Sequence, residues 1–218
     1  LINKKTKAIS VVHLNGWPAD MKGICDLAKN FGLYVIEDCA QAHGAKIEGD
    51  SVGSFGDVAA WSFCQDKIIT TGGEGGFITT NNESIYTDIC SFRDHGKNIT
   101  LAKEPSKKIG FRWLHENLGS NLRLTEFQAA IGRSQLNKLS KWNIIRNRNS
   151  SIFKQNLKDC ELVRIPTPNK SLIHAWYKFY VYVNPELFLP DWNRERVIEA
   201  INKKGYPAFT GSCSEIYL

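Results

Sequence analysis

Two residues that could do chemistry together, Asp38 and Lys67, each follow an apolar run of the sequence. The first run, residues 34–36, ends at Glu37 and Asp38, and the second, residues 58–63, leads through a short polar stretch to Lys67. Apolar runs bounded by turn residues are typical of strands in a parallel or mixed sheet that is covered on both faces. Because ligands bind at the carboxyl ends of such strands, we expect Asp38 and Lys67 at the same edge.

A lysine and a carboxylate at one sheet edge suit one particular kind of catalysis. A lysine amine that loses its proton in a partly desolvated pocket can form a Schiff base with a carbonyl compound. Pyridoxal phosphate enzymes need such a lysine, together with an acidic partner for the pyridinium nitrogen of the cofactor. On spacing alone a plainer interpretation stays open, in which Asp38 caps the following segment and Lys67 is a solvated loop residue.

The motifs around these residues resemble those of the sugar aminotransferases of the DegT/DnrJ/EryC1/StrS family. They occur in the family's order and cover nearly the whole chain, which makes a chance resemblance improbable. The segments that carry the resemblance are IEDCAQAHGA at 36–45, SVGSFGD at 51–57, WSFCQDK at 61–67, TTGGEGG at 70–76, FRDHGKN at 92–98 and HENLGSNLRLTEFQAAIGRSQLNKL at 115–139.

This resemblance implies a role for each of five residues. Lys67 would carry pyridoxal 5'-phosphate and shuttle the proton, and Asp38 would pair with the pyridinium nitrogen. Gln41 would touch the cofactor ring or its phenolic oxygen, and the Ser62 hydroxyl would donate to the phosphate. Asn121 would reach the cofactor phosphate of the neighbouring subunit in a homodimer. Each of the last three residues also has a plainer alternative. Gln41 could form a hydrogen bond within its loop, and the Ser62 hydroxyl could bond to nearby backbone. Asn121 could simply be an asparagine of a turn.

Two histidines near these motifs are predicted to be structural. His13 lies at the end of a strand and His43 lies within the IEDCAQAHGA motif, and we assign neither to the site. The glycines at 72–76 match no nucleotide-binding fingerprint and instead predict a turn that lets the backbone pass close to Lys67.

The chain departs from the family at both ends. Family members carry an earlier segment with a Ser-Gly-Thr turn at a helix N-terminus, which holds the cofactor phosphate, and an aromatic residue that stacks on the ring. No equivalent precedes Leu1, and residues 215–218 stop where the family continues. We therefore expect an internal fragment of a longer protein, which leaves open whether it is active alone.

The fold class predicted is α/β, with a mostly parallel central sheet and helices on both faces. Residues 8–14 form a predicted strand, and residues 19–31 form a predicted helix whose apolar residues recur at spacings of three and four before Gly32. The strand that carries Asp38 follows, so the pattern is βαβ with a parallel pairing. We predict a large pyridoxal phosphate-binding domain at 1–140, a linking helix at 141–160 and an incomplete small α+β domain at 161–218.

Further elements are predicted from local patterns. Residues 82–93 are predicted to form a surface helix with Ile85, Ile89 and Phe92 pointing inward. Residues 99–112 are predicted to form a polar, basic loop. Thr125 and Gln128 have the spacing of a capping box at the start of a helix, whose apolar face would consist of Leu124, Phe127, Ile131 and Leu136.

The C-terminal third is expected to hold a strand and a helix. Residues 175–183 alternate aromatic and other residues as a strand does, and Asp191 could cap a helix that runs to about Lys204 and ends at Gly205.

Composition agrees with an ordinary globular enzyme. Hydrophobic residues make up 42% and charged residues 23%, and the net charge of +6 is spread along the chain, so no nucleic-acid partner is predicted. No apolar run approaches the roughly 20 residues that span a bilayer, and no membrane association is predicted. The six cysteines show no CxxC pair and no metal-ligand spacing: Cys25, Cys39, Cys64, Cys90, Cys160 and Cys213. The first four fall within apolar patterns, which predicts reduced core residues in a cytoplasmic protein.

The resemblance implies an aminotransferase that acts on a nucleotide-linked keto sugar with an amino acid as nitrogen donor, commonly glutamate in this family. Such enzymes make amino sugars for surface polysaccharides or antibiotics. A related branch replaces the lysine by histidine and dehydrates sugars, and Lys67 argues against that branch. Two alternatives remain: a catalytically silent regulatory or interaction protein on the same fold, and a nicotinamide-binding α/β enzyme, against which the missing dinucleotide fingerprint counts.

Overall fold

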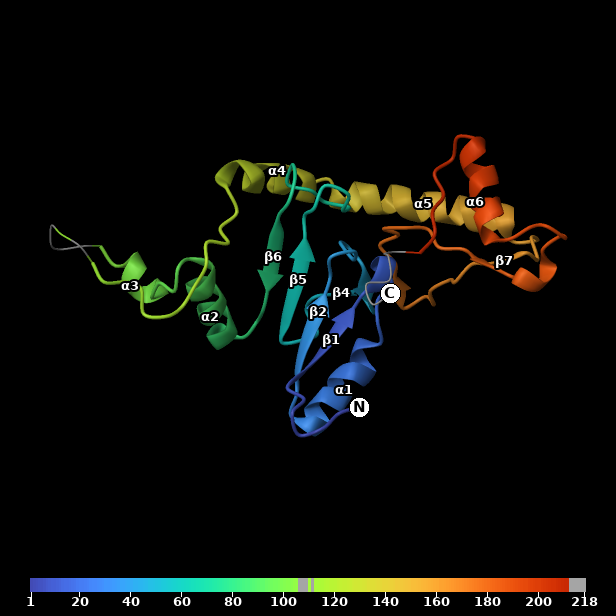
Figure 1. Ribbon diagram of the computed structural model, residues 1–218. Helices are drawn as coiled ribbons and strands as arrows, with labels where there is room; N and C mark the ends of the chain where they lie inside the picture. The colour runs from blue at the N-terminus through green and yellow to red at the C-terminus, as the bar shows by residue number, and fades with distance from the viewer. Residues whose placement is uncertain (106–109, 111, 212–218) are drawn as a thin grey trace.

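The centre of the molecule is a four-stranded sheet. The computed structural model describes residues 1–105, 110 and 112–211. In the sheet β1 (Ala8–Val12), β2 (Tyr34–Asp38) and β5 (Val58–Ser62) are parallel neighbours, and β6 (Gly76–Thr79) pairs antiparallel with β5 (Figure 1). The predicted α/β class with a mostly parallel sheet is therefore confirmed.

Helix α1 (Met21–Phe31) connects β1 to β2 and packs against them. It begins two residues later than predicted because the Asp20 side chain caps it by accepting from the Gly23 N–H at 3.1 Å. It ends as predicted at Gly32, which adopts the left-handed conformation with φ 62°. The helix buries Met21 and Ala28 against two sheet residues that point to one face, Val11 and Val35.

The two faces of this sheet differ in cover. Side chains alternate along a strand, so Tyr34 and Ile36 point away from the face that α1 covers, as does Ile78 through its pairing with Ala60. These three apolar side chains are exposed, Tyr34 by 57%. Among the described residues, the helices thus leave this second face open.

Helix α2 (Glu83–Arg93) matches the predicted element, with Asn82 as its cap. Ile85 and Ile89 are half-buried, but Phe92 is 53% exposed, so the prediction that it points inward is wrong. The buried residue at this point is Ser91, and the next residue on a helix is turned away by about 100°.

A short helix, α3 (Ile99–Lys103), replaces the first part of the loop predicted at 99–112. Its cap is Asn98, whose side-chain oxygen accepts from the Leu101 N–H at 3.0 Å. This capping bond satisfies a backbone donor that the loop prediction overlooked. Residues 106–109 and 111 lie outside the described residues.

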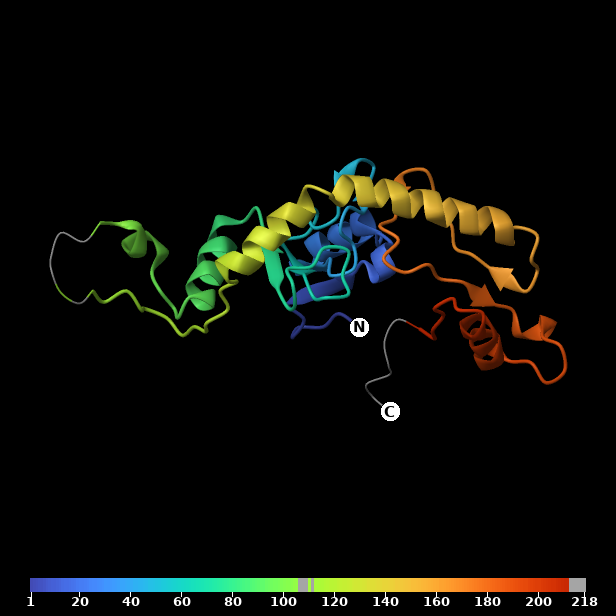
Figure 2. The same ribbon diagram turned by 90° about the horizontal axis from the view of Figure 1, so that it is seen from above.

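Helices α4 (Glu126–Leu136) and α5 (Leu139–Leu157) run end to end as one long rod past the sheet (Figure 2). The predicted capping box of Thr125 and Gln128 is present. The predicted apolar face is only partly buried, since Phe127 and Leu136 are exposed. A polar contact adds to the burial of the other two, Leu124 and Ile131: the Gln128 amide donates to the Glu74 carbonyl at 2.7 Å.

The C-terminal lobe contains little regular structure. β7 (Val163–Arg164) pairs with β9 (Tyr182–Val183), while β8 (Leu172–Ile173) joins a small sheet with β3 (Lys46–Ile47) and β4 (Asp50–Ser51). Short 3₁₀ turns occur at Leu14–Gly16 and Pro185–Leu187. The predicted strand at 175–183 is wrong except for its last two residues.

Helix α6 (Arg194–Lys203) is the last described helix. Its cap is Asn193, which accepts from the Arg196 N–H at 2.8 Å, and the prediction of Asp191 as the cap is wrong. Asp191 has a positive φ of 68° and lies outside the first turn. Gly205, with φ 86°, follows the end of the helix as predicted.

Two global features also bear on the predictions. Among the helices that the structure describes, none combines the length and apolar character needed to cross a membrane. The five cysteines in the described part of the chain carry free thiols, and Cys39 is fully buried. Cys213 lies outside the described residues.

Glu37 is a fully buried carboxylate at the carboxyl end of β2. Its oxygens accept four hydrogen bonds, of 2.6–2.9 Å, from the backbone N–H groups of Gly53, Phe55 and Gly56 and from Nε2 of His13. A buried charge needs such partners, because it has lost its hydration. The bonds tie the residue after β1 and the loop before β5 to the end of β2.

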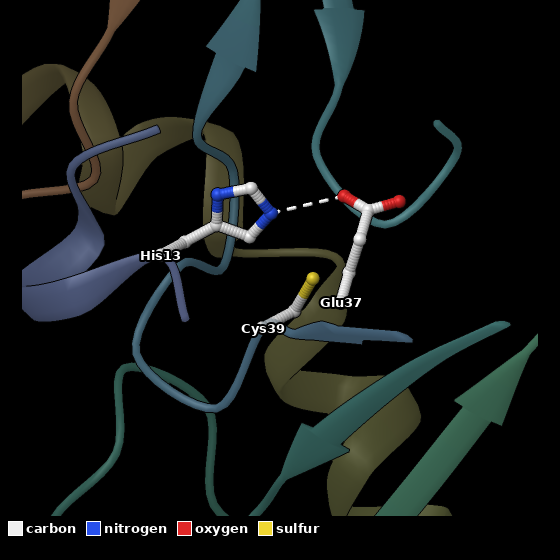
Figure 3. Close-up of side chains that lie close together, drawn as sticks. All are labelled: His13, Glu37 and Cys39. Atoms are coloured by element: carbon white, nitrogen blue, oxygen red, sulfur yellow. Dashed lines mark hydrogen bonds and ion pairs between the residues drawn. The ribbon is translucent and has the colours of Figure 1, made fainter. Parts of the chain in front are cut away.

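His13, Glu37 and Cys39 lie close enough together that their ligand atoms could hold a metal ion (Figure 3). Their hydrogen bonds favour a structural role. Nδ1 of His13 accepts from the Ala19 N–H at 3.1 Å, so the ring proton is on Nε2 and points at Glu37. Burial, with the charges of Glu37 and Asp38, raises the pKa of the Cys39 thiol, which stays protonated. His13 is thus a satisfied buried histidine, as predicted.

We predict that Glu37→Gln destabilises the fold by about 3 kcal/mol, because an amide NH₂ group would then face backbone N–H donors in place of an acceptor. Burial acts to raise the pKa of Glu37, but the bonds from His13 and the three N–H groups outweigh it and lower the pKa below 4.5. The wild-type advantage is therefore complete above about pH 4.5 and is lost as the pH falls through the lower folded value. Urea unfolding across this range measures both effects.

The matched control is Glu161→Gln, which changes an exposed carboxylate in the same way. If Glu37→Gln unfolds at the same urea concentration as this control at pH 7, the carboxylate does not hold the sheet edge together.

Candidate active site

Asp38 and Ser62 end two neighbouring parallel strands on the same face of the sheet. The register pairs Asp38 with Ala60, and Ser62 follows Ala60 by two residues, so all three side chains point to one side. The carboxyl ends of these strands form the edge at which the sequence predicts chemistry. The three side chains point to the face of the sheet that α1 leaves open.

The Asp38 carboxylate is half-buried and only partly engaged. Its Oδ1 accepts from the Ala40 N–H at 3.0 Å, which is the capping contact that spacing alone suggested. Its Oδ2 makes no hydrogen bond to any residue that the structure describes, so one oxygen is available to a ligand.

Gln41 joins the loop after β2 to the loop after β1. Its side-chain oxygen accepts from the Asn15 N–H at 2.6 Å, and Asn15 adopts the left-handed conformation with φ 60°. This is the loop hydrogen bond that was the alternative to a cofactor contact. Within the described chain the amide NH₂ group of Gln41 has no acceptor, so it can still donate to a ligand.

The Ser62 hydroxyl oxygen accepts a long bond, 3.3 Å, from the Cys64 N–H. That contact is the backbone alternative considered from the sequence. Because a hydroxyl both accepts and donates, Ser62 keeps its proton for a further acceptor.

Lys67 is not a solvated loop lysine, since only 16% of its side chain is exposed. Its ammonium lies 3.3 Å from Oδ1 of Asp66 and donates to the Tyr177 hydroxyl oxygen at 3.4 Å. Burial lowers the pKa of Lys67, but the bonds to Tyr177 and Asp66 outweigh burial and raise it. The amine is therefore protonated at neutral pH in the free protein.

Asp66 and Tyr177 were not predicted as site residues. Asp66 stands in the WSFCQDK motif beside Lys67, so its nearness could have been inferred. Tyr177 lies 110 residues further along the chain, within a stretch predicted as a strand, and no spacing or motif signals its contact with Lys67.

His43 is buried behind the site between the rings of Trp61 and Phe63. Neither of its ring nitrogens has a hydrogen-bond partner in the part of the chain that the structure describes. Burial and the nearby charge of Lys67 lower the pKa of His43 to about 4, so the ring is neutral at pH 7.

The glycine turn after Lys67 packs against itself and α4. A Cβ atom at Gly75 would lie 2.4 Å from the Thr71 hydroxyl, and one at Gly72 would lie 3.0 Å from Ile131. Gly72 also has a φ of 83°. These glycines therefore meet the needs of a tight turn, and the predicted close passage of their backbone by Lys67 remains a prediction.

Asn121 lies apart from the other four predicted residues. It is exposed in the segment before α4, its side-chain oxygen accepts from Nε of Arg123 at 3.1 Å, and its backbone forms a bridge with Asp94. Among the described residues no hydrogen bond joins Asn121 to Asp38, Ser62 or Lys67. The chain thus gathers Asp38, Gln41, Ser62 and Lys67 around one sheet edge and leaves Asn121 outside it.

Known proteins are similar to this chain in sequence, and solved structures are similar to it in fold. GDP-perosamine synthase of Escherichia coli O157:H7 is 38% identical over 176 residues, 81% of this chain and 45% of that protein. The solved structure of an aminotransferase from Psychrobacter cryohalolentis matches with a TM-score of 0.94 and 46% identity, over 100% of this chain and 57% of that chain.

A second solved structure contains a cofactor. E. coli GDP-4-keto-6-deoxy-D-mannose-3-dehydratase with bound hydrated PLP matches with a TM-score of 0.79 and 25% identity, over 94% of this chain and 53% of that chain. The chain spans about half the length of these relatives.

The model of the DegT/DnrJ/EryC1/StrS aminotransferase family matches residues 1–209, which include every predicted site residue. The family predicted from the motifs is confirmed: the chain belongs to the DegT/DnrJ/EryC1/StrS aminotransferase family.

Proposed function

We propose that the protein of which this chain forms part is a pyridoxal phosphate-dependent aminotransferase that aminates a nucleotide-linked keto sugar. The observation that carries this proposal is a mostly buried lysine amine, Lys67, at the edge of the sheet where Asp38 and Ser62 end adjacent parallel strands. An amino acid would supply the nitrogen.

The residues at this edge fit pyridoxal phosphate. Asp38 has a carboxylate oxygen without a described partner, which suits a pyridinium nitrogen, and Ser62 has a hydroxyl proton to give to a phosphate oxygen. Gln41 has an amide NH₂ group for a phenolic oxygen. When bound, pyridoxal phosphate supplies an electron-poor ring that absorbs the electrons released when a carbon–hydrogen bond breaks.

The chain's own residues would bind the cofactor and move protons. The Asp38 carboxylate would keep a proton on the ring nitrogen through an ion pair. Lys67 would hold the cofactor covalently through Nζ, and that amine, once released, would take a proton from the donor amino acid and later give one to the sugar carbon.

The names of the relatives support a nucleotide sugar as substrate. One relative is named GDP-perosamine synthase, and a solved neighbour is named a GDP-4-keto-6-deoxy-D-mannose-3-dehydratase. Both names point to sugars linked to a nucleoside diphosphate. The presence of Lys67 favours transamination over dehydration for this chain.

The assembly proposed is a homodimer in which Asn121 serves the partner's site. Asn121 is exposed, and its amide NH₂ group can donate to phosphate oxygens. A two-fold axis would carry the loop of each subunit to the facing site, and the exchange would be reciprocal.

The first prediction from this proposal is that borohydride reduction of the intact, cofactor-loaded protein fixes the cofactor on Lys67. Peptide mapping should find the label there, and Lys67→Ala should abolish both the label and turnover while leaving the fold intact. Lys141→Ala, at an exposed position, is the matched control and should behave as wild type. Label on another lysine would refute the assignment, and an unlabelled, inactive intact protein would favour the silent regulatory alternative.

The second prediction is that Asp38→Asn keeps the shape of the site and slows turnover by about 100-fold or more, because the ring loses the charge that keeps its nitrogen protonated. Steady-state kinetics measure the loss, with cofactor content checked by absorbance. Asp88→Asn, on the exposed surface of α2, provides the control. Turnover near the wild-type rate in cofactor-loaded Asp38→Asn would contradict the role.

The third prediction is that two inactive variants, Asn121→Ala and Lys67→Ala, restore activity when their subunits exchange. In a mixed dimer one site carries both defects and the other carries neither, so activity should return to at most about half the wild-type level per mixed dimer. Mixing Lys67→Ala with differently tagged Lys67→Ala should restore nothing. If exchange is demonstrated and the first mixture stays inactive, Asn121 does not serve the partner's site.

A further inference from the structure

The Tyr177 hydroxyl lies between two charged groups of the loop after β5, the Asp66 carboxylate and the Lys67 ammonium. It donates a short hydrogen bond to Oδ2 of Asp66 and accepts one from Nζ of Lys67 at 3.4 Å. The order of donors follows from the chemistry, since an ionised carboxylate only accepts and an ammonium only donates. The Lys67 ammonium also lies over the Tyr177 ring, 5.1 Å from its centre.

The segment that carries Tyr177 is fixed to the loop after β1. The N–H groups of Ala175 and Tyr177 donate to the carbonyls of Gly16 and Asn15 at 2.9 and 3.1 Å. The contact is close, because a Cβ atom at Gly16 would lie 2.8 Å from the Cβ of Ala175. Asn15 also donates its N–H to Gln41, so one short loop holds both Tyr177 and a predicted cofactor ligand.

The residue before Tyr177 is strained. Trp176 has a φ of 51°, which is an outlier for a bulky aromatic residue. The surrounding structure enforces it: Arg146 donates to the Trp176 carbonyl at 2.9 Å and the indole donates to Asn147 at 3.0 Å. The ring of His174 stacks on the indole at 4.0 Å.

The strained residue directly precedes Tyr177 in the chain. Strain of this kind persists where a particular side-chain placement is needed, and it is concentrated at functional sites. Here the next side chain, that of Tyr177, contacts Lys67 in the loop after β5.

We propose that Tyr177 is a positioning residue, whose hydroxyl bridges Asp66 and Lys67 and so holds the lysine amine in place until a ligand binds. This inference rests on the proposed function of Lys67. It also assigns the C-terminal segment at 174–177 a part in the site, because that segment supplies the bridge.

The test is Tyr177→Phe in the intact protein, which removes the hydroxyl and keeps the ring. The pH dependence of Lys67 labelling by an amine-reactive reagent, read by mass spectrometry without cofactor, reports when the amine becomes neutral. Burial lowers the pKa of Lys67 while the bonds to Tyr177 and Asp66 raise it, so loss of the hydroxyl should move the labelling midpoint to lower pH. Absorbance titration of the cofactor-loaded protein gives a second readout of the pH at which Lys67 titrates, by spectroscopy instead of labelling.

Tyr182→Phe is the matched control. Tyr182 lies on β9 in the same lobe and stacks on Arg164 at 4.4 Å, and its substitution should leave the midpoint unchanged. If Tyr177→Phe changes only the thermal midpoint and leaves the labelling midpoint with the wild type, Tyr177 is merely structural and the inference is wrong.

A double-mutant cycle tests the bridge itself. Asp66→Asn should also lower the labelling midpoint, and the double variant should shift it by less than the sum of the single shifts, because both changes break one connected unit. Additive shifts would overturn the bridge. These outcomes do not depend on the borohydride result, so a failure of the bridge and a failure of Lys67 as the cofactor lysine can be told apart.

Discussion

The buried carboxylate of Glu37 is the interaction on which the rest of the structure depends. A charge without hydration must be given hydrogen bonds, and Glu37 obtains four, from three backbone N–H groups of the loop before β5 and from His13 after β1. Two segments that are separate in sequence are thereby fixed to the end of β2. The next residue is Asp38, so the hydrogen bonds of Glu37 also fix the position of this proposed cofactor ligand.

A second constraint is the loop that contains Asn15 and Gly16. Its backbone donates to Gln41 and accepts from Tyr177 and Ala175, which connects the end of β2 to the C-terminal lobe. Both Asn15 and Gly16 have positive φ, and Gly16 leaves too little room for a Cβ atom. The site is therefore built from backbone geometry as much as from reactive side chains, and residues that do no chemistry determine where the reactive ones lie.

The elements that sequence predicted well are those whose causes are local. The βαβ unit, Gly32 and the Thr125–Gln128 capping box follow from apolar periodicity and capping chemistry within a few residues. Strand ends also predicted the edge that holds Asp38, Ser62 and Lys67. The failures have tertiary causes. The turn at Trp176 is held by Arg146 and Asn147, about 30 residues earlier in the chain, so the alternating pattern at 175–183 wrongly predicted a strand. Phe127 and Leu136 look like core residues by period alone, yet they are exposed.

Lys67 combines two opposed influences, and their balance explains why Tyr177 matters. Burial of most of the side chain favours the neutral amine, which is the nucleophile, whereas Asp66 and the Tyr177 hydroxyl favour the ammonium and prevail in the free protein. The pKa of a group held between such influences shifts when one contact is lost. Displacement of the Tyr177 hydroxyl by an incoming ligand would remove one stabilising bond while the burial remained. The pKa of the amine would then fall, in the direction of the neutral form that the proposed role of Lys67 requires.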